Sequence, residues 1–122
     1  MNQIIVKNLK IFAYHGVHDF EKKDGQDFFV DAVLNLPEMP GFETDEINKV
    51  ISYSEVVRVI KKVMTEKSYN LIEKAAVEII SEIFSSFSEV ESVDITVKKP
   101  HAPIKEDFEY VAVRFKKVRG EK

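Results

Sequence analysis

Residues 52–88, "SYSEVVRVIKKVMTEKSYNLIEKAAVEIISEIFSSFS", decide the fold because they repeat a helical hydrophobic pattern twice. In 52–68, apolar side chains recur at intervals of three and four residues, which predicts an amphipathic helix. In 70–88 the pattern recurs, and its apolar face consists of Ile72, Ala76, Ile79, Ile83 and Phe87. The stretch therefore predicts two amphipathic helices in succession.

Polar residues at the start of each half are typical of helix N-termini. Ser52 and Glu55 have the spacing of a capping box, and Asn70 with Glu73 three residues later predicts an N-cap for the second helix. A carboxylate in a first turn also complements the helix dipole. Taken alone, Glu55 and Glu73 therefore have a sufficient structural explanation.

Alternating apolar and polar residues, the signature of strands, lie on both sides of the helical pair. Two such segments, 4–14 and 27–36, precede the helices, and two more, 93–99 and 108–118, follow them. Residues 37–50 contain two of the four prolines and no clean period, which indicates a loop that holds a short helical turn.

The resulting order, ββααββ, predicts the α+β class, with a four-stranded antiparallel sheet and both helices on one face. A chain of 122 residues with 44% hydrophobic content can bury a modest core. We therefore expect a single domain over residues 1–122.

The composition excludes several classes of function. The formal net charge is −3, so the basic excess of a nucleic-acid binder is missing. The absence of cysteine excludes disulfides, thiolate zinc sites and a cysteine nucleophile. No apolar run approaches the roughly 20 residues of a membrane span, and the N-terminus lacks a secretory apolar core. We expect a soluble, cytoplasmic protein that binds neither nucleic acid nor membranes.

The segment "KKPHAPI", residues 98–104, ends the third strand. Lys99 shares the parity of Val93, Ile95 and Val97, so it is predicted to point inward, whereas Lys98 points to the other face and is expected to be solvated. Pro100 cannot donate to the sheet and stops the strand at that point. Lys99 is then either a lysine that snorkels at a strand end or an ammonium held near a pocket.

Other candidate groups carry weaker signals. His15 and His18, with Asp19 and Glu21 close by, superficially resemble a metal cluster. They follow a strand, where no helix fixes their geometry, and no second ligand pair appears elsewhere, so we expect no metal site. Tyrosines are more often core or interface residues than acids or bases, and this chain has four: Tyr14, Tyr53, Tyr69 and Tyr110.

Six short stretches nevertheless occur in an order and at a spacing that resemble one family. They are "AYHG" (13–16), Glu21 followed by "GQ" (25–26), "VD" (30–31), "YSEV" (53–56), "LIE" (71–73) and "KPHAPI" (99–104). None is decisive by itself. Together they cover residues 13–104 and resemble the dihydroneopterin aldolase family.

The resemblance implies a tunnelling fold (T-fold), in which the strands of several subunits form a barrel with the helices outside. It implies a homo-oligomer, a tetrameric ring that stacks into an octamer, with sites shared between subunits. The implied reaction belongs to folate biosynthesis: a lyase cleaves 7,8-dihydroneopterin, a pterin, to 6-hydroxymethyl-7,8-dihydropterin and glycolaldehyde, often with epimerisation at the 2′ carbon. Because the substrate ring already contains a C=N bond that accepts electrons, neither a metal nor another cofactor is expected.

The resemblance also assigns roles to residues. Glu73 is implied to anchor the pterin, Lys99 to lie near the reacting side chain, and Glu21 to order the water that transfers protons. Tyr53 is implied to come from the neighbouring subunit, to contact the substrate and to exchange protons with it. Backbone groups at two further positions complete the implied pterin contacts: Ile51 and Ile72.

The chain departs from the family pattern at the rim of the implied pocket. Lys105 and Glu106 stand where the family commonly has Pro-Gly, and Glu109 replaces an aspartate. Three alternatives therefore stay open. The first is an epimerase of dihydroneopterin or its triphosphate, which Lys105 favours, and the second is a non-catalytic T-fold protein that binds pterins. The zinc-dependent cyclohydrolase relatives fit less well, because their thiolate ligand is missing.

Overall fold

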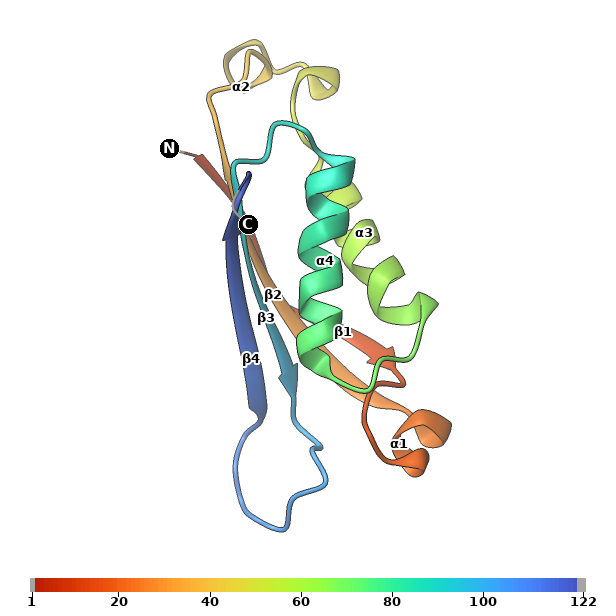
Figure 1. The fold of residues 1–122 in the computed structure, drawn as a ribbon. Coiled ribbons are helices and arrows are strands. Elements are labelled where there is room, and N and C mark those ends of the chain that lie inside the picture. The colour runs from red at the N-terminus through yellow and green to blue at the C-terminus, as the bar shows by residue number, and fades with distance from the viewer. Residues whose placement is uncertain (1, 121–122) are drawn as a thin grey trace.

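The computed structural model describes residues 2–120 and contains four long strands and two long helices (Figure 1). The elements in chain order are β1 (Asn2–Ala13), α1 (Asp19–Asp24), β2 (Gln26–Leu36), α2 (Gly41–Thr44), the 3₁₀ helix η1 (Ile47–Lys49), α3 (Tyr53–Glu66), α4 (Ile72–Ser86), β3 (Ser92–Lys99) and β4 (Val111–Val118). The predicted order ββααββ is confirmed, and the loop 37–50, where one short helical turn was expected, contains two, α2 and η1. The short helix α1 was not predicted.

The four strands form one antiparallel sheet in the order β1-β2-β3-β4. Helices α3 and α4 lie side by side on one face of this sheet (Figure 1). The predicted fold class is therefore confirmed. None of the helices in the described part of the chain is long and apolar enough to cross a lipid bilayer.

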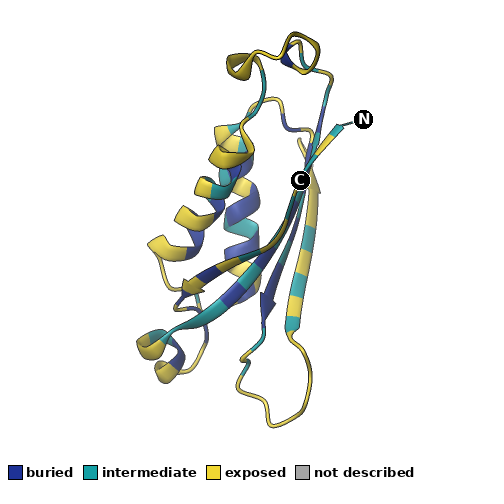
Figure 2. Ribbon diagram, turned by 180° about the vertical axis from the view of Figure 1, so that it is seen from behind, coloured by how far each residue is buried: buried dark blue, intermediate teal, exposed yellow. Residues whose placement is uncertain are grey.

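The core lies between the sheet and the two helices, where buried residues gather on the inner sides of both layers (Figure 2). Every second residue of β2 from Phe28 to Leu36 is buried, because alternate side chains of a strand point to the same face. The strands β2 and β3 meet α3 and α4 through these fully or almost fully buried side chains: Phe28, Val30, Ala32, Leu34, Val93, Ile95, Val97, Val56, Ile60, Met64, Ala76, Ile79 and Ile83. Each large one stabilises the fold by roughly 1.5–3 kcal/mol relative to exposure.

The caps of the long helices differ from expectation. Helix α4 begins one residue later than predicted, so its N-cap is Leu71 and the prediction of Asn70 was wrong. Ser52 is the N-cap of α3, but its side chain makes no capping hydrogen bond, and Glu55 pairs instead with Arg58 at 2.6 Å. Packing of the apolar stripes, rather than side-chain capping, therefore supports these helices.

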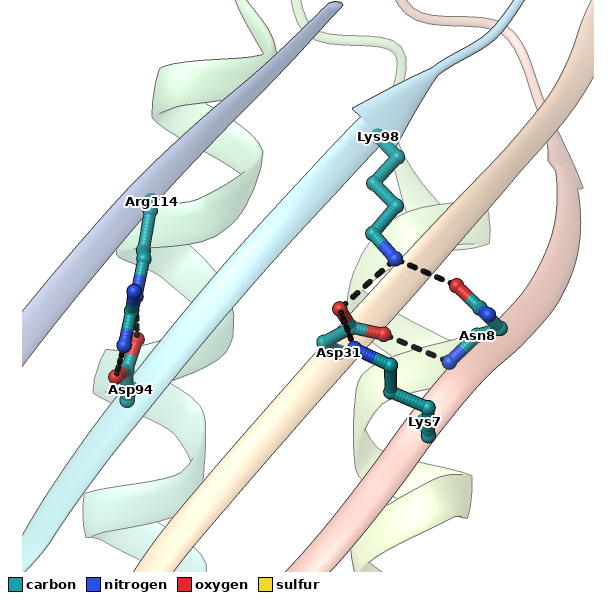
Figure 3. A network of polar contacts seen from close by, with 6 residues as sticks. All are labelled: Lys7, Asn8, Asp31, Asp94, Lys98 and Arg114. Atoms are coloured by element: carbon teal, nitrogen blue, oxygen red, sulfur yellow. Dashed lines mark hydrogen bonds and ion pairs between the residues drawn. The ribbon is translucent and has the colours of Figure 1, made fainter. Parts of the chain in front are cut away.

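The face of the sheet away from the helices carries a polar network around Asp31 (Figure 3). Strand β1 changes register near Asn8, whose φ is 53°, and the Asn8 N–H donates to Asp31 Oδ1 at 2.7 Å. Lys98 Nζ lies 2.9 Å from Asp31 Oδ2 and donates to Asn8 Oδ1 at 2.6 Å, whereas Lys7 reaches Asp31 at 3.3 Å. Lys98 also lies 5.2 Å from the centre of the Tyr110 ring.

Lys98 therefore points to the predicted face, but the expectation that it is solvated was wrong. Only 8% of the residue is exposed, because Asp31, the Asn8 bulge and Tyr110 surround its ammonium. Burial alone raises the pKa of Asp31, but the hydrogen bonds from Asn8, Lys98 and Lys7 outweigh it and hold the pKa below its ordinary value. Nearby, Arg114 forms a two-pronged pair with Asp94 at 3.0 and 2.7 Å (Figure 3).

Two lysines on one carboxylate offer a matched test of this network. Lys98→Met keeps most of the apolar stem but removes the buried ammonium, so the free energy of unfolding should fall by about 1–3 kcal/mol. Lys7→Met removes an exposed partner of the same Asp31 and should change stability far less. Urea unfolding of both variants measures the difference. If both lose the same free energy of unfolding, burial does not make the Lys98 pair stronger than the Lys7 pair.

Candidate functional site

A pocket of about 320 Å³ opens at one end of the molecule. It lies where β3 ends and α4 begins, next to α1 and the start of β4, and these elements meet at the same end in Figure 1. Four of the predicted site residues line it: Glu21, Ile72, Glu73 and Lys99. The fold therefore brings together two carboxylates and one ammonium that lie far apart in the sequence.

Lys99 points to the helix side of the sheet, as its parity predicted, and forms the central ion pair of the pocket. Its Nζ lies 2.5 Å from Glu21 Oε2, and the exposed fractions of the two residues are 8% and 3%. Two opposite charges at this distance, largely shielded from water, attract each other far more strongly than a surface pair does. The interpretation of Lys99 as a lysine that only snorkels to solvent is therefore wrong.

Three hydrogen-bond donors converge on the Glu21 carboxylate. Lys99 and Gln26 Nε2 approach Oε2, the latter at 3.2 Å, and the backbone N–H of His18 approaches Oε1 at 3.3 Å. Burial by itself raises the pKa of Glu21, but the bonds from Lys99, His18 and Gln26 lower it, and they prevail. Glu21 is therefore an ionised carboxylate that holds Lys99 in place.

The short helix α1 is what delivers Glu21 to the pocket. Its N-cap is His18, and the chain just before it passes so close to Glu21 that position 16 requires glycine. A Cβ on Gly16 would lie 2.4 Å from the Glu21 Cδ, and the φ of Gly16 is +151°. Lys22 also donates to the Gly16 carbonyl.

The opposite wall is the first turn of α4. Leu71 and Ile72 contribute apolar surface, and Glu73 is exposed beside them. Within the described chain no ion pair engages the Glu73 carboxylate, whereas Glu21 is fully committed to its partners. Glu73 is therefore the acidic group of this pocket that is open to a ligand.

The connection between β3 and β4 forms the rim. Ala102, Pro103 and Ile104 line the pocket, whereas Lys105 is exposed and does not. Residues 101 and 103–110 are all exposed. Two short-range bonds brace the turn, from Ile104 N–H to the Ala102 carbonyl at 2.8 Å and from Glu106 N–H to the Ile104 carbonyl at 2.9 Å.

Tyr53 and Ile51 do not lie in this pocket. They line a separate and larger hollow of about 630 Å³, together with Phe42, Ile47 and neighbouring residues of β1. Figure 1 shows the start of α3 at the opposite end of the molecule from the start of α4. Tyr53 is 71% exposed. A single chain thus brings together four of the six predicted site residues and leaves the other two apart.

The histidines do not form the cluster that their spacing suggested. His15 is fully buried, and the backbone engages both of its ring nitrogens, whereas His18 is exposed. Within residues 2–120, no three side chains of the metal-binding types gather closely enough to hold an ion. Sequence reasoning gave no role to the backbone of His18, to Gly16 or to Gln26. Gly16 and Gln26 had a signal only as members of the motifs "AYHG" and "GQ", and His18 lies in neither motif.

Comparison with known proteins finds relatives that match nearly the whole chain. A family model described as "FolB: Dihydroneopterin aldolase" matches residues 4–116. The dihydroneopterin aldolases of Streptomyces coelicolor and Bacillus subtilis are 35% and 30% identical to this chain over 113 residues, covering 93% of it and 94% of each relative. The crystal structure of Escherichia coli dihydroneopterin aldolase in complex with neopterin superimposes with a TM-score of 0.86 at 20% identity, over 96% of this chain and 99% of that one.

Gly16→Ala tests the close approach that fixes Glu21. The new methyl group displaces the carboxylate from Lys99 and strains the backbone, so the free energy of unfolding should fall by about 3 kcal/mol. Gly120→Ala is the control, because its φ is also positive, +83°, but no atom lies within 4 Å of the new Cβ. It should cost about 1 kcal/mol. Equal losses in thermal or urea unfolding would show that Gly16 matters for backbone conformation alone.

Proposed function

The chain belongs to the dihydroneopterin aldolase family, and we propose that it is a folate-pathway lyase that cleaves 7,8-dihydroneopterin. The products are 6-hydroxymethyl-7,8-dihydropterin and glycolaldehyde. The observation that carries the proposal is the buried Lys99–Glu21 pair in the same pocket as the free carboxylate of Glu73. A pocket of about 320 Å³ has the size of a small heterocyclic ligand.

The chemistry needs little beyond binding and proton transfer. When a base removes the proton of the 2′ hydroxyl, the bond between the 1′ and 2′ carbons breaks, and glycolaldehyde leaves. The electron pair moves into the C=N bond of the dihydropterin ring, and a proton delivered to the 1′ carbon completes the product. The ring thus supplies the electron sink that other aldolases obtain from a lysine Schiff base or a metal.

Lys99 supplies the positive charge for this reaction. Its ammonium, fixed by Glu21 at the pocket wall, favours the negative charge that develops on the substrate as its proton is lost. Glu21 is held by three donors, so its role is to keep Lys99 in place and to order the water that carries protons. Burying the charge of either residue without the opposite charge of its partner would destabilise the fold.

Glu73 recognises the pterin. Its carboxylate can accept two parallel hydrogen bonds from the ring N–H and the adjacent amino group, the same fork geometry that joins a carboxylate to an arginine. The backbone of Ile72, beside it in the first turn of α4, adds a further contact. The apolar side chain of Leu71 lies along the same wall and supports a flat ring.

Tyr53 and Ile51 complete the site from a second copy of the chain, in a homo-oligomeric ring. Two observations support this assembly. The edge strands β1 and β4 each have one neighbour within the described sheet, so both edges are open to strands of other copies. Large apolar side chains also lie exposed around the Tyr53 hollow, with Ile47 at 89% and Phe42 at 42%. Two such rings stack to make the octamer.

The runner-up function is an epimerase of dihydroneopterin or its triphosphate. The charges at the pocket disfavour the triphosphate: Lys99 is the cation among the lining residues, and its charge is already matched by Glu21. The rim carries Lys105 but also Glu106, Asp107 and Glu109. Chromatography of the products from 7,8-dihydroneopterin tests the choice, since glycolaldehyde release indicates cleavage and stereoisomer exchange without release indicates epimerisation alone.

Lys99→Met should lower kcat about 10²–10⁴-fold, the range that a positioned acid–base or charged group contributes. The variant keeps an apolar side chain of similar length, and thermal unfolding checks that the protein stays folded. Lys23→Met, which removes an exposed lysine of α1, is the control and should turn over at the wild-type rate. Wild-type turnover by folded Lys99→Met would contradict the role of the ammonium.

A mixing experiment tests whether the site is shared. Tyr53→Phe and Glu73→Ala should each be nearly inactive, the first without its proton-exchanging hydroxyl and the second without its pterin anchor. If the two variants are unfolded together and reassembled in equal amounts, about one interface in four pairs an intact Tyr53 with an intact Glu73. Activity should therefore return to about a quarter of the wild-type level.

The control is each variant unfolded and reassembled alone, which should stay inactive. Size measurements and mass spectrometry establish that mixed rings have formed. If mixed rings are as inactive as the parents, Tyr53 and Glu73 belong to the same chain's site, and the shared-site arrangement is wrong.

A further inference from the structure

His15 is fully buried between the end of β1 and the start of α1, although it takes no part in the ion pair of the pocket. Its ring packs against two aromatic rings, edge-on to Phe28 and stacked on Tyr69, each with centroids 5.4 Å apart. The other two histidines, His18 and His101, are exposed. A fully buried titratable ring keeps its polar nitrogens only where each has a hydrogen-bond partner.

The hydrogen bonds of His15 fix its protonation state. The backbone N–H of Tyr69 donates to Nδ1 at 2.9 Å, so Nδ1 carries no proton. Nε2 lies 2.8 Å from the carbonyl oxygen of Met64, so it must carry the proton and donate it. The arrangement therefore accepts only the neutral Nε2–H tautomer. A proton added at Nδ1 would face the Tyr69 N–H and break that bond.

These bonds join the two walls of the pocket. Tyr69 directly precedes residues 70–73, which line one wall, and the next residue after His15 adds a second bond, from Gly16 N–H to the Tyr69 carbonyl at 3.0 Å. On its other side Gly16 is packed against the Glu21 carboxylate. The pair His15–Gly16 is thus clamped between the connection that leads into Glu73 and the helix that carries Glu21.

We propose that His15, as the neutral Nε2–H tautomer, is a positioning residue that sets the spacing between the Glu73 wall and the Lys99–Glu21 wall of the pocket. This role rests on the proposed function, because it assigns to that spacing the affinity for the pterin. The hydrogen bonds of His15 go to Met64 and Tyr69, whereas Lys99 is held by Glu21, so the ammonium keeps its partner when His15 is replaced. Loss of the clamp should therefore raise KM and leave kcat almost unchanged.

Burial and the neighbouring lysines also favour the neutral form of His15. Burial is the main cause that lowers its pKa below the ordinary 6.5, the bond to Met64 opposes this, and Lys99 and Lys22 lower it further. Because the folded state favours the neutral ring, the stability that His15 contributes is fully present above pH 6.5 and is lost as the pH falls below it. The clamp is thus intact at neutral pH and weakens in acid.

The first test uses the unaltered protein labelled with ¹⁵N and needs no substrate. Histidine ring NMR at pH 7 should show His15 as the Nε2–H tautomer, with a titration midpoint below 6.5. The amide signals of Tyr69 and of residues 70–73 should move with that titration. A ring protonated at Nδ1, or amide signals that do not follow His15, would overturn the proposal even if every variant failed to fold.

The second test compares two substitutions. His15→Asn places an amide oxygen near the position of Nδ1 and can still accept the Tyr69 N–H, whereas His15→Leu accepts nothing. His15→Leu should raise KM for 7,8-dihydroneopterin about tenfold or more, as expected when one buried backbone hydrogen bond is lost, with kcat nearly unchanged. His15→Asn should recover most of the affinity, and His101→Asn, at an exposed histidine outside the pocket lining, should match the wild type.

An unchanged KM in folded His15→Leu, or equal increases for Leu and Asn, would overturn the positioning role. Failure of the proposed function is a separate outcome, because the wild-type protein would then release no glycolaldehyde at all. In that case the NMR titration still decides whether His15 joins the two walls.

Discussion

The ion pair between Lys99 and Glu21 is the interaction on which the site depends. Two opposite charges are held 2.5 Å apart with little solvent around them, and either one alone would be costly to bury. The pair also supports local structure, because α1 has six residues and a helix of that length is unstable by itself. The end of β3 therefore holds α1 in place, and α1 in turn holds the ammonium at the pocket wall.

The end of β3 carries two adjacent lysines that form ion pairs on opposite faces of the sheet. Lys99 and Lys98 are adjacent, so they point to opposite faces, and each finds a carboxylate on a different element: Glu21 on α1 and Asp31 on β2. Both ammonium groups are largely buried, one beside the helices and one on the back of the sheet. An ion pair therefore holds the strand on each face of the sheet at the point where its apolar alternation stops.

The sequence predicted the elements whose periodicity runs over many residues. The stripes of 52–68 and 70–88 and the alternation of the four strands were sufficient for the fold class, and parity alone placed Lys99 on the helix side. Helix α1 was missed because six residues cannot establish a period. The burial of Lys98 was missed because it depends on a bulge at Asn8 and on Asp31, which only the pairing of β1, β2 and β3 brings together.

Within the site, the resemblance to a family supplied Glu21, Glu73, Lys99 and Ile72 as a set, which residue types alone did not. The structure adds what neither could: Gln26, the His18 backbone and Gly16 fix the orientation of Glu21 through contacts that leave no periodic trace. His15 was considered only as a metal ligand, because its real partners are backbone groups of residues 64 and 69, about fifty positions away.

The connection between β3 and β4 has an evolutionary consequence. It forms the pocket rim, yet almost all of it is exposed, and its turn is braced by bonds within itself rather than to the helices. Insertions and substitutions in such a segment carry a small folding cost. Descendants of this chain can therefore change the pocket entrance at little cost in stability, whereas a change at Lys99 or Glu21 leaves a buried charge without its partner.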